Sequence, residues 1–266
     1  MSGSPDRPAL MPDALPYLSL VLPAYNEEGN LEQAVAQSIA PLSAITESWE
    51  IVIVNDASTD RTPAVADGLA AAHPGRVRVV HHAQNAGLGG AIRTGFAAAR
   101  GDVLAYCDAD LPFDMDDLVR AHEILMATGA DVVNGVRVNR KDLEGPRRRA
   151  ITRVYNAIIE GALHLGVRDV NCPLKLVRRS AYERMDLRSI GCFIDAEILA
   201  EARRAGLKIE EVDAHYRIRV EGVSTLTRPS VVLAVLRDVA LFRTGRLRDH
   251  HPSPPDRRPA HPAPAP

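Results

Sequence analysis

Short apolar runs rich in β-branched residues alternate along the chain with longer segments whose apolar residues recur at helical spacing. The apolar runs lie at 17–23, 49–56, 77–82, 102–108 and 130–137. The helical segments lie at 30–40, 62–72, 90–100 and 115–128. Strands that alternate with helices of about 10 to 15 residues form βαβ units, which pair into parallel sheets. We therefore predict an α/β fold with a Rossmann-like, mostly parallel sheet flanked by helices.

The pattern changes after the fifth apolar run. Residues 137–153 carry seven Lys and Arg against two Asp and Glu. Helices are predicted at 151–165 and 195–205 with a loop between them, and Gly206 is suited to end the second helix. A last apolar segment, 230–243, is interrupted by charged residues. We predict a C-terminal amphipathic helix there, because a bilayer span needs roughly 20 apolar residues.

The two ends of the chain are rich in proline and poor in apolar residues. Residues 1–16 hold four prolines and residues 250–266 hold seven. Such segments bury too little apolar surface to offset their ordering entropy. We expect a flexible 1–16, a globular domain over 17–227, an amphipathic helix over 228–249 and a disordered tail over 250–266.

Composition mainly excludes classes of protein. The 266 residues are 46% hydrophobic and 25% charged, which suits a soluble globular protein that folds without a disulfide or metal. A net charge of −2 argues against nucleic-acid binding. The cysteines, Cys107, Cys172 and Cys192, form no Cys-x-x-Cys pair, so we expect reduced thiols in a cytoplasmic protein. The first residues do not have the pattern of a signal peptide.

Polar clusters follow three of the predicted strands. The first strand ends in 23–28 (Pro-Ala-Tyr-Asn-Glu-Glu), the second in 55–60 (Asn-Asp-Ala-Ser-Thr-Asp) and the fourth in 108–110 (Asp-Ala-Asp). Ligands of open α/β sheets bind at the carboxyl ends of the strands, so these clusters predict a ligand site at one edge of the sheet. For Asp60 and Asn26 a second interpretation stays open, namely that each caps the helix that follows.

The Asp-x-Asp pair indicates more specific chemistry. Asp108 and Asp110 come directly after the apolar run that ends in Cys107, and they place two carboxylates on the same side of the chain. A divalent cation that bridges to phosphate oxygens offsets the repulsion between them, because hard cations prefer oxygen ligands. We therefore predict metal or nucleotide contact for Asp110.

Three common nucleotide or nucleophile motifs are excluded by the residues present. In 87–92 (Gly-Leu-Gly-Gly-Ala-Ile), Ile92 stands where the third glycine of a dinucleotide-binding fingerprint should fall, and the segment follows the third strand rather than the first. The chain has neither a phosphate-binding Walker loop nor a Gly-x-Ser-x-Gly elbow.

Taken in order, several segments resemble family 2 glycosyltransferases with the GT-A fold, and within that family the dolichyl- and polyprenyl-phosphate sugar synthases. The three strand-end clusters carry most of the resemblance. The other segments are 85–95 (Asn-Ala-Gly-Leu-Gly-Gly-Ala-Ile-Arg-Thr-Gly), 135–137 (Gly-Val-Arg), 193–199 (Phe-Ile-Asp-Ala-Glu-Ile-Leu), 202–206 (Ala-Arg-Arg-Ala-Gly) and 219–224 (Arg-Val-Glu-Gly-Val-Ser). The resemblance covers about residues 17–227 and implies that this stretch is a catalytic domain.

The resemblance implies a nucleotide-sugar site. The residues implied to bind the nucleotide sugar are Pro23, Tyr25, Glu27, Val54, Asp56, Asp108, Ala109 and Arg137. Asp110 would bind Mg²⁺ or Mn²⁺ across the diphosphate. Pro112 stands where many relatives have a Gln that adds a metal ligand, so metal binding would rest on Asp110 and the phosphates.

The resemblance also implies catalytic and acceptor residues. Asp110, Asp195 and Arg219 would be catalytic, with Asp195 near the sugar, and Arg219 and Ser224 would hold the acceptor phosphate, which a guanidinium can grip with two hydrogen bonds. Thr225 replaces the lysine that relatives have after the serine. The candidates to replace that cation are Arg93, Arg217 and the arginines at 147–149.

The implied reaction is an inverting transfer of mannose from GDP-mannose or of glucose from UDP-glucose. A polyprenyl or dolichyl phosphate is already an anion and needs no general base. The alternative acceptor, a hydroxyl of a glycan or small molecule, needs one, and Asp195 is the best candidate. Two non-catalytic alternatives stay open, a silent nucleotide-sugar-binding protein and a scaffold on the membrane.

Basic and amphipathic segments favour the lipid acceptor. The arginine-rich 140–153 and the helix at 228–249 suit the anionic, cytoplasmic face of a membrane. The alternative is that this helix packs on the domain and that the arginines are simply solvated.

Overall fold

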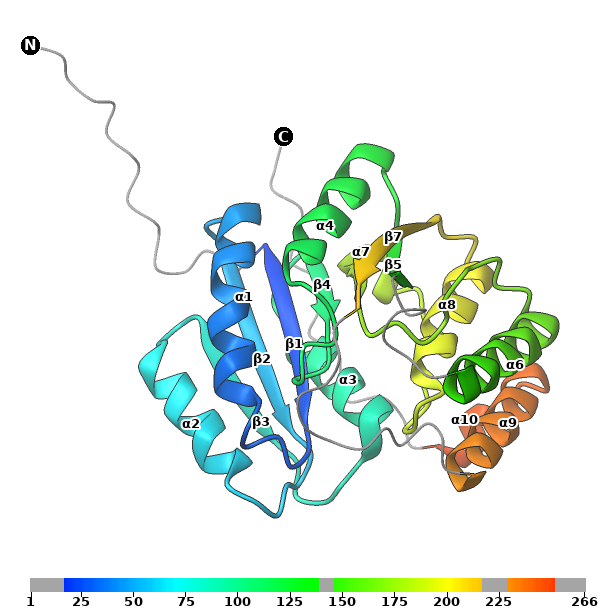
Figure 1. The fold of residues 1–266 in the computed structure, drawn as a ribbon, viewed down its shortest axis with the longest axis horizontal. Helices are drawn as coiled ribbons and strands as arrows, with labels where there is room; N and C mark the ends of the chain where they lie inside the picture. The colour runs from blue at the N-terminus through cyan, green and yellow to red at the C-terminus, as the bar shows by residue number, and fades with distance from the viewer. Residues whose placement is uncertain (1–16, 139–145, 217–228, 252–266) are drawn as a thin grey trace, which may run out of the picture.

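The computed structural model describes residues 17–138, 146–216 and 229–251. It has three layers, with a seven-stranded sheet in the middle and helices on both faces (Figure 1). The predicted flexible region 1–16, residues 252–266 of the predicted tail 250–266, and the predicted phosphate-site residues Arg217, Arg219 and Ser224 lie outside the described residues.

The sheet is mostly parallel, as predicted. Its strands are β1 (Leu18–Ala24), β2 (Trp49–Asn55), β3 (Val77–His81), β4 (Val103–Tyr106), β5 (Val132–Val138), β6 (Lys175–Arg178) and β7 (Ile209–His215). Their order in the sheet is β3-β2-β1-β4-β6-β5-β7. Only β6 runs antiparallel to its neighbours, β4 and β5. The five strands predicted from the sequence are β1 to β5.

The helices divide between the two faces of the sheet. They are α1 (Leu31–Ile45), α2 (Thr62–Ala72), α3 (Gly87–Ala98), α4 (Asp116–Thr128), α6 (Pro146–Leu163), α7 (Arg179–Tyr182), α8 (Ile194–Arg204), α9 (Pro229–Arg243) and α10 (Leu247–His250). Apolar residues of α1, α2 and α4 pack on one face, and those of α3, α6, α7, α8 and α9 pack on the other. Each fully buried aliphatic side chain contributes about 1.5–3 kcal/mol to this packing.

The prediction of a loop between the helices at 151–165 and 195–205 is wrong in part. The segment 166–193 holds β6 and the short helix α7, and β7 follows α8. β6 has only four residues and begins and ends with a charge, so it resembles a loop in sequence. Gly206 does end α8, in the left-handed conformation that glycine adopts readily (φ +66°).

The C-terminal helix is present and packs on the domain through one side. α9 buries Val235, Val239 and Phe242, and the Phe242 ring meets the Phe193 ring edge-on at 5.8 Å between centroids. Leu233, on the other side, is 70% exposed. None of the helices in the described part of the chain has both the length and the hydropathy needed to cross a bilayer.

Candidate functional site

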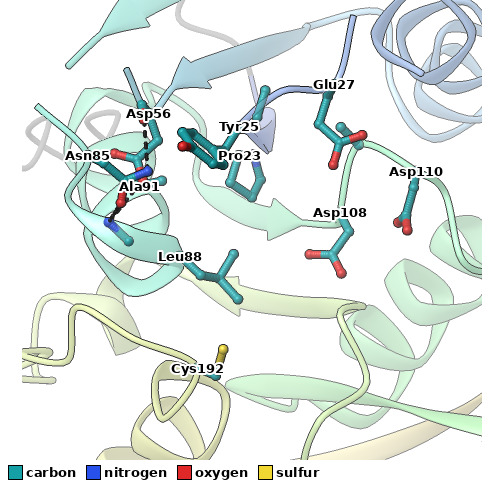
Figure 2. A pocket seen from close by; sticks show the side chains of 13 residues that line it. Pro23, Tyr25, Glu27, Asp56, Asn85, Leu88, Ala91, Asp108, Asp110 and Cys192 are labelled. Atoms are coloured by element: carbon teal, nitrogen blue, oxygen red, sulfur yellow. Dashed lines mark hydrogen bonds between the residues drawn. The ribbon is translucent and has the colours of Figure 1, made fainter. Parts of the chain in front are cut away.

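A pocket of about 350 Å³ opens at the carboxyl ends of β1, β2 and β4 (Figure 2). Its lining residues are Pro23, Ala24, Tyr25, Glu27, Asp56, Asn85, Gly87, Leu88, Ala91, Asp108, Ala109, Asp110 and Cys192. Seven of the predicted site residues therefore lie together around one cavity, at the edge of the sheet where the strand-end clusters predicted it.

The chain turns sharply where each of these three strands ends. Asn26, Ala57 and Leu111 follow β1, β2 and β4, and all three have positive φ angles (56°, 58° and 43°). Residues other than glycine seldom adopt this conformation, and they concentrate at functional sites when they do. The first two turns brace each other, because Asn26 Oδ1 accepts a hydrogen bond from the Thr59 backbone N–H at 2.8 Å.

Asp56 organises one end of the pocket. Its Oδ1 accepts the backbone N–H of Ala86 at 2.7 Å, and its Oδ2 accepts that of Gly87 at 2.9 Å. The Nδ1 atom of His82 lies 2.7 Å from the same Oδ1. Asn85 Nδ2 donates to the Asp56 backbone carbonyl at 3.1 Å. The carboxylate thus fixes the start of α3 against the end of β2, beside Tyr25 (Figure 2).

Three carboxylates gather at the other end, those of Glu27, Asp108 and Asp110 (Figure 2). The Leu111 N–H donates to the Asp108 carbonyl at 3.1 Å and closes a tight turn that holds the Asp-Ala-Asp segment. Burial, and then the charges of Asp108 and Asp110, raise the pKa of the Cys107 thiol behind them well above its usual range. This end of the pocket is therefore lined by three carboxyl groups.

Oxygen donors of this kind fit Mg²⁺ or Mn²⁺. No group of three or more His, Cys, Asp or Glu side chains in the described ranges is arranged to hold a metal ion by itself. An ion at Asp110 would therefore take its remaining ligands from a bound diphosphate and water. Metal binding by Asp110 and the phosphates stays a prediction.

Asp60 lies outside the pocket. Its Oδ1 accepts the Thr62 N–H at 2.9 Å at the start of α2, and its Oδ2 accepts the Glu28 N–H at 3.3 Å. Of the two interpretations of Asp60, the structure therefore favours the one in which it caps the following helix.

Asp195 is buried and does not line the pocket. Its Oδ1 lies 2.8 Å from the Nζ of Lys175, a lysine with no exposed surface, and it also accepts the hydroxyl of Tyr106. Lys175 donates further to the carbonyls of Val170 at 3.0 Å and Cys172 at 2.7 Å. Burial, and then the Asp195 carboxylate, raise the pKa of the Tyr106 hydroxyl well above its usual range. The cluster joins β4, β6 and α8.

Three further predicted residues also lie away from the pocket. Arg137 forms a two-pronged ion pair with Asp169, with Nε–Oδ2 at 2.7 Å and Nη2–Oδ1 at 2.8 Å. Val54 has no exposed surface and packs in the core between the sheet and α3. Arg93, suggested as a replacement cation, is buried and donates to the Arg188 carbonyl at 2.8 Å.

Sequence reasoning assigned no role to several lining residues. The glycine-rich segment 85–95 contributes four of them, Asn85, Gly87, Leu88 and Ala91. Its sequence contributed to the family resemblance but was given no place in the site. Cys192 precedes α8 by two residues, and no pattern in the sequence points to it.

Comparisons with known proteins identify the family. Residues 19–186 match the family described as glycosyl transferase family 2. Glycosyltransferase AglD of Haloferax volcanii is 36% identical over 77% of this chain and 34% of its own length. Dolichyl-phosphate beta-glucosyltransferase ALG5A of Trichomonas vaginalis is 31% identical over 89% of this chain and 78% of its own. The undecaprenyl-phosphate 4-deoxy-4-formamido-L-arabinose transferase of Pseudomonas paraeruginosa is 32% identical over 66% of this chain and 51% of its own.

Solved structures agree on the fold. Glucosyl-3-phosphoglycerate synthase from Mycobacterium tuberculosis, crystallised with Mn²⁺, UDP-glucose and phosphoglyceric acid, superposes with a TM-score of 0.67 at 22% identity, over 91% of this chain and 86% of that one. The chain spans a third to a half of AglD and the arabinose transferase, and most of ALG5A. It belongs to glycosyl transferase family 2 and has the GT-A-like α/β fold that its motifs predicted.

Proposed function

We propose that this glycosyltransferase moves a sugar, with inversion, from a nucleotide sugar to the phosphate of a polyprenyl or dolichyl carrier. UDP-glucose and GDP-mannose are the candidate donors. The similarity to a dolichyl-phosphate glucosyltransferase and to a synthase crystallised with UDP-glucose favours UDP-glucose. Similarity to enzymes named for dolichyl and undecaprenyl phosphate supports the class of acceptor.

The donor would lie along the pocket with its two ends recognised differently. Tyr25, Asp56 and Asn85 stand at the end suited to the base and ribose, and Asp108 and Asp110 stand at the end suited to the diphosphate. A divalent metal held at Asp110 would neutralise charge on the diphosphate as it leaves. Arg219 and Ser224 are proposed to hold the acceptor phosphate.

The position of Asp195 is the observation that carries the choice of acceptor. A general base must reach the proton it removes, and Asp195 is the candidate that a hydroxyl acceptor would need. Its carboxylate instead faces a fully buried lysine and a tyrosine hydroxyl, and only 6% of the residue is exposed. A phosphate acceptor is already ionised and needs no base. The geometry therefore favours an anionic acceptor over a hydroxyl.

Two neighbouring helices supply a surface suited to a lipid carrier. α6 exposes Val154 and Ile158, and α9, which packs beside it, exposes Leu233 and Leu236. Arg243 at the end of α9, Arg246 in the turn after it and Arg248 on α10 are exposed, and Arg248 is paired with Asp186. Apolar side chains flanked by cations suit an anionic membrane surface, so we propose peripheral association with the cytoplasmic face.

The test is transfer of labelled sugar into an organic-extractable product. Purified protein is incubated with Mg²⁺ or Mn²⁺, labelled UDP-glucose or GDP-mannose, and a short polyprenyl phosphate. We expect label in the organic phase with one donor, and none when the polyprenyl alcohol replaces the phosphate. Metal-dependent hydrolysis of a donor without lipid product would contradict the lipid acceptor and restore the hydroxyl alternative.

A further inference from the structure

The glycine-rich start of α3 lies against the loop formed by residues 188–192, which precedes α8. The Gly89 N–H donates to the Ile190 carbonyl at 3.0 Å. A Cβ atom on Gly87 would lie 2.3 Å from the Ile190 carbonyl oxygen, and one on Gly89 would lie 2.3 Å from that of Ser189. Real Cβ atoms do not approach backbone so closely, so these glycines are required for the contact between the two segments.

Two buried charged residues hold the same loop from its inner side. Glu197, on the first turn of α8, accepts the N–H of Arg188 through Oε1 and the N–H of Ser189 through Oε2, both at 2.8 Å. Arg93 of α3 donates to the Arg188 carbonyl at 2.8 Å. Glu197 has no exposed surface and Arg93 is only 3% exposed. A buried N–H or carbonyl that loses its partner cannot turn to water instead, so the loop is firmly held.

The loop reaches the pocket through its last residue. Cys192 lines the cavity together with Leu88 and Gly87, across from Tyr25 and Asp108 (Figure 2). Gly87 is in turn held by the Asp56 carboxylate. One hydrogen-bonded wall therefore runs from the end of β2, through the start of α3, to the 188–192 loop.

We propose that Arg93 and Glu197 are positioning residues. They hold the 188–192 loop in place as a wall of the donor pocket and thereby support binding of the nucleotide sugar. This proposal rests on the proposed function for the identity of the donor, but not for the acceptor. In this proposal the glycines at the start of α3 allow close packing between two parts of the wall and do not form a phosphate-binding loop. Neither residue touches the donor.

Cys192 reports the position of the wall without any need for transfer. Cys107 and Cys172 have no exposed surface, so a thiol reagent in mild conditions reaches Cys192 first. Burial, and then the charges of Asp195 and Asp108, raise the pKa of the Cys192 thiol to about 11, which keeps it slow to react in the intact protein. A displaced loop exposes this thiol to water and speeds its alkylation.

The first experiment measures alkylation of Cys192 by N-ethylmaleimide, followed by mass spectrometry, with and without UDP-glucose and Mn²⁺. We expect Glu197→Gln to react about tenfold faster than the parent and to need about tenfold more UDP-glucose for protection, because it loses one buried backbone hydrogen bond. Glu201→Gln is the matched control. It removes a carboxyl group from the same helix, but its backbone partner is Asp186, which lies outside the 188–192 loop and whose carboxylate accepts the Arg188 side chain at 2.7 Å.

Gly89→Ala tests the contact between α3 and the 188–192 loop without changing an ionisable side chain. It should push the loop away and raise both the alkylation rate and the UDP-glucose concentration for protection, whereas Gly68→Ala, on α2 with open space around it, should change neither. In the transfer assay, Glu197→Gln and Gly89→Ala should each raise KM for the donor and leave kcat within about twofold of the parent value.

The proposal would be overturned if alkylation and protection are unchanged in the folded variants. It would also be overturned if neither UDP-glucose nor GDP-mannose protects Cys192 of the parent protein. Protection without lipid product would instead contradict the proposed acceptor and leave the wall in place.

Discussion

The two halves of the sheet use their charged residues differently. In the half formed by β3, β2, β1 and β4, all strands are parallel, and carboxylates at the strand ends line a pocket. In the half formed by β6, β5 and β7, the candidate residues Arg137 and Asp195 are turned inward and paired with Asp169 and Lys175. In the first half the carboxylates of Glu27, Asp108 and Asp110 line the pocket, whereas Arg137 and Asp195 form ion pairs that join elements. Residue type alone does not separate these roles; burial and partners do.

Asp110→Ala tests the ligand-binding half and should have the largest effect. Loss of the predicted metal ligand should lower kcat/KM for transfer by roughly 10²–10³-fold, because charge on the departing diphosphate is no longer offset. Thermal unfolding should be close to that of the parent, since the residue lies on the pocket wall. Near-normal turnover in this variant would remove Asp110 from the metal site.

Lys175→Met tests the structural half. Removing the ammonium leaves the Asp195 carboxylate buried without its cation, which should lower the free energy of unfolding by about 3–5 kcal/mol in urea titrations. Replacing Lys175 and Asp195 together by apolar residues should recover much of this loss. If the double variant is no more stable than the single one, the two side chains are not coupled as a pair.

Leu233→Asp tests whether the exposed side of α9 meets lipid. Binding to vesicles containing anionic lipid, measured by sedimentation, should fall roughly tenfold, because an exposed leucine contributes about 1.5 kcal/mol or more when buried. Met126→Asp is the control, since it changes an exposed apolar residue of α4, on the other face of the sheet. Equal losses in both variants would show that the effect is not specific to α9.

Glu197→Gln should change the pH dependence of stability. Burial, partly offset by the N–H groups of Arg188 and Ser189 and by Arg93, and reinforced by Glu201, raises the pKa of Glu197 from 4.5 to about 7. Between these values the folded protein holds a proton that the unfolded chain has released, so the contribution of this group to stability falls as pH rises. Unfolding free energies measured across that window should show a shallower decline in the variant. A steeper one would contradict the raised pKa.

The ligand-binding half could be predicted well from the sequence, because parallel strands bring their carboxyl ends to one edge. That rule alone placed Tyr25, Asp56 and Asp110 near one another, and the structure has all three in one pocket. Val54 does not line the pocket, because residues on a buried strand alternate between the two faces of the sheet and its side chain lies in the core.

The other half depended on pairings that sequence spacing does not reveal. Asp195 meets Lys175 across 20 residues, and Arg137 meets Asp169 across 32. Both partners lie in the stretch predicted as a loop, and Lys175 begins β6, a strand too short to show an alternating pattern. Cys192 enters the pocket only because Glu197, Arg93 and the glycines of α3 hold its loop there.

Asp195→Asn tests the central claim, that Asp195 pairs with Lys175 and is not a general base, so that the acceptor is an anion. The measurement is kcat for sugar transfer to polyprenyl phosphate, corrected for the folded fraction and set beside the free energy of unfolding. We predict a kcat within about tenfold of the parent and a clearly lower stability. A kcat lowered by roughly 10²–10⁴-fold in a stably folded variant would make Asp195 the base and contradict the account.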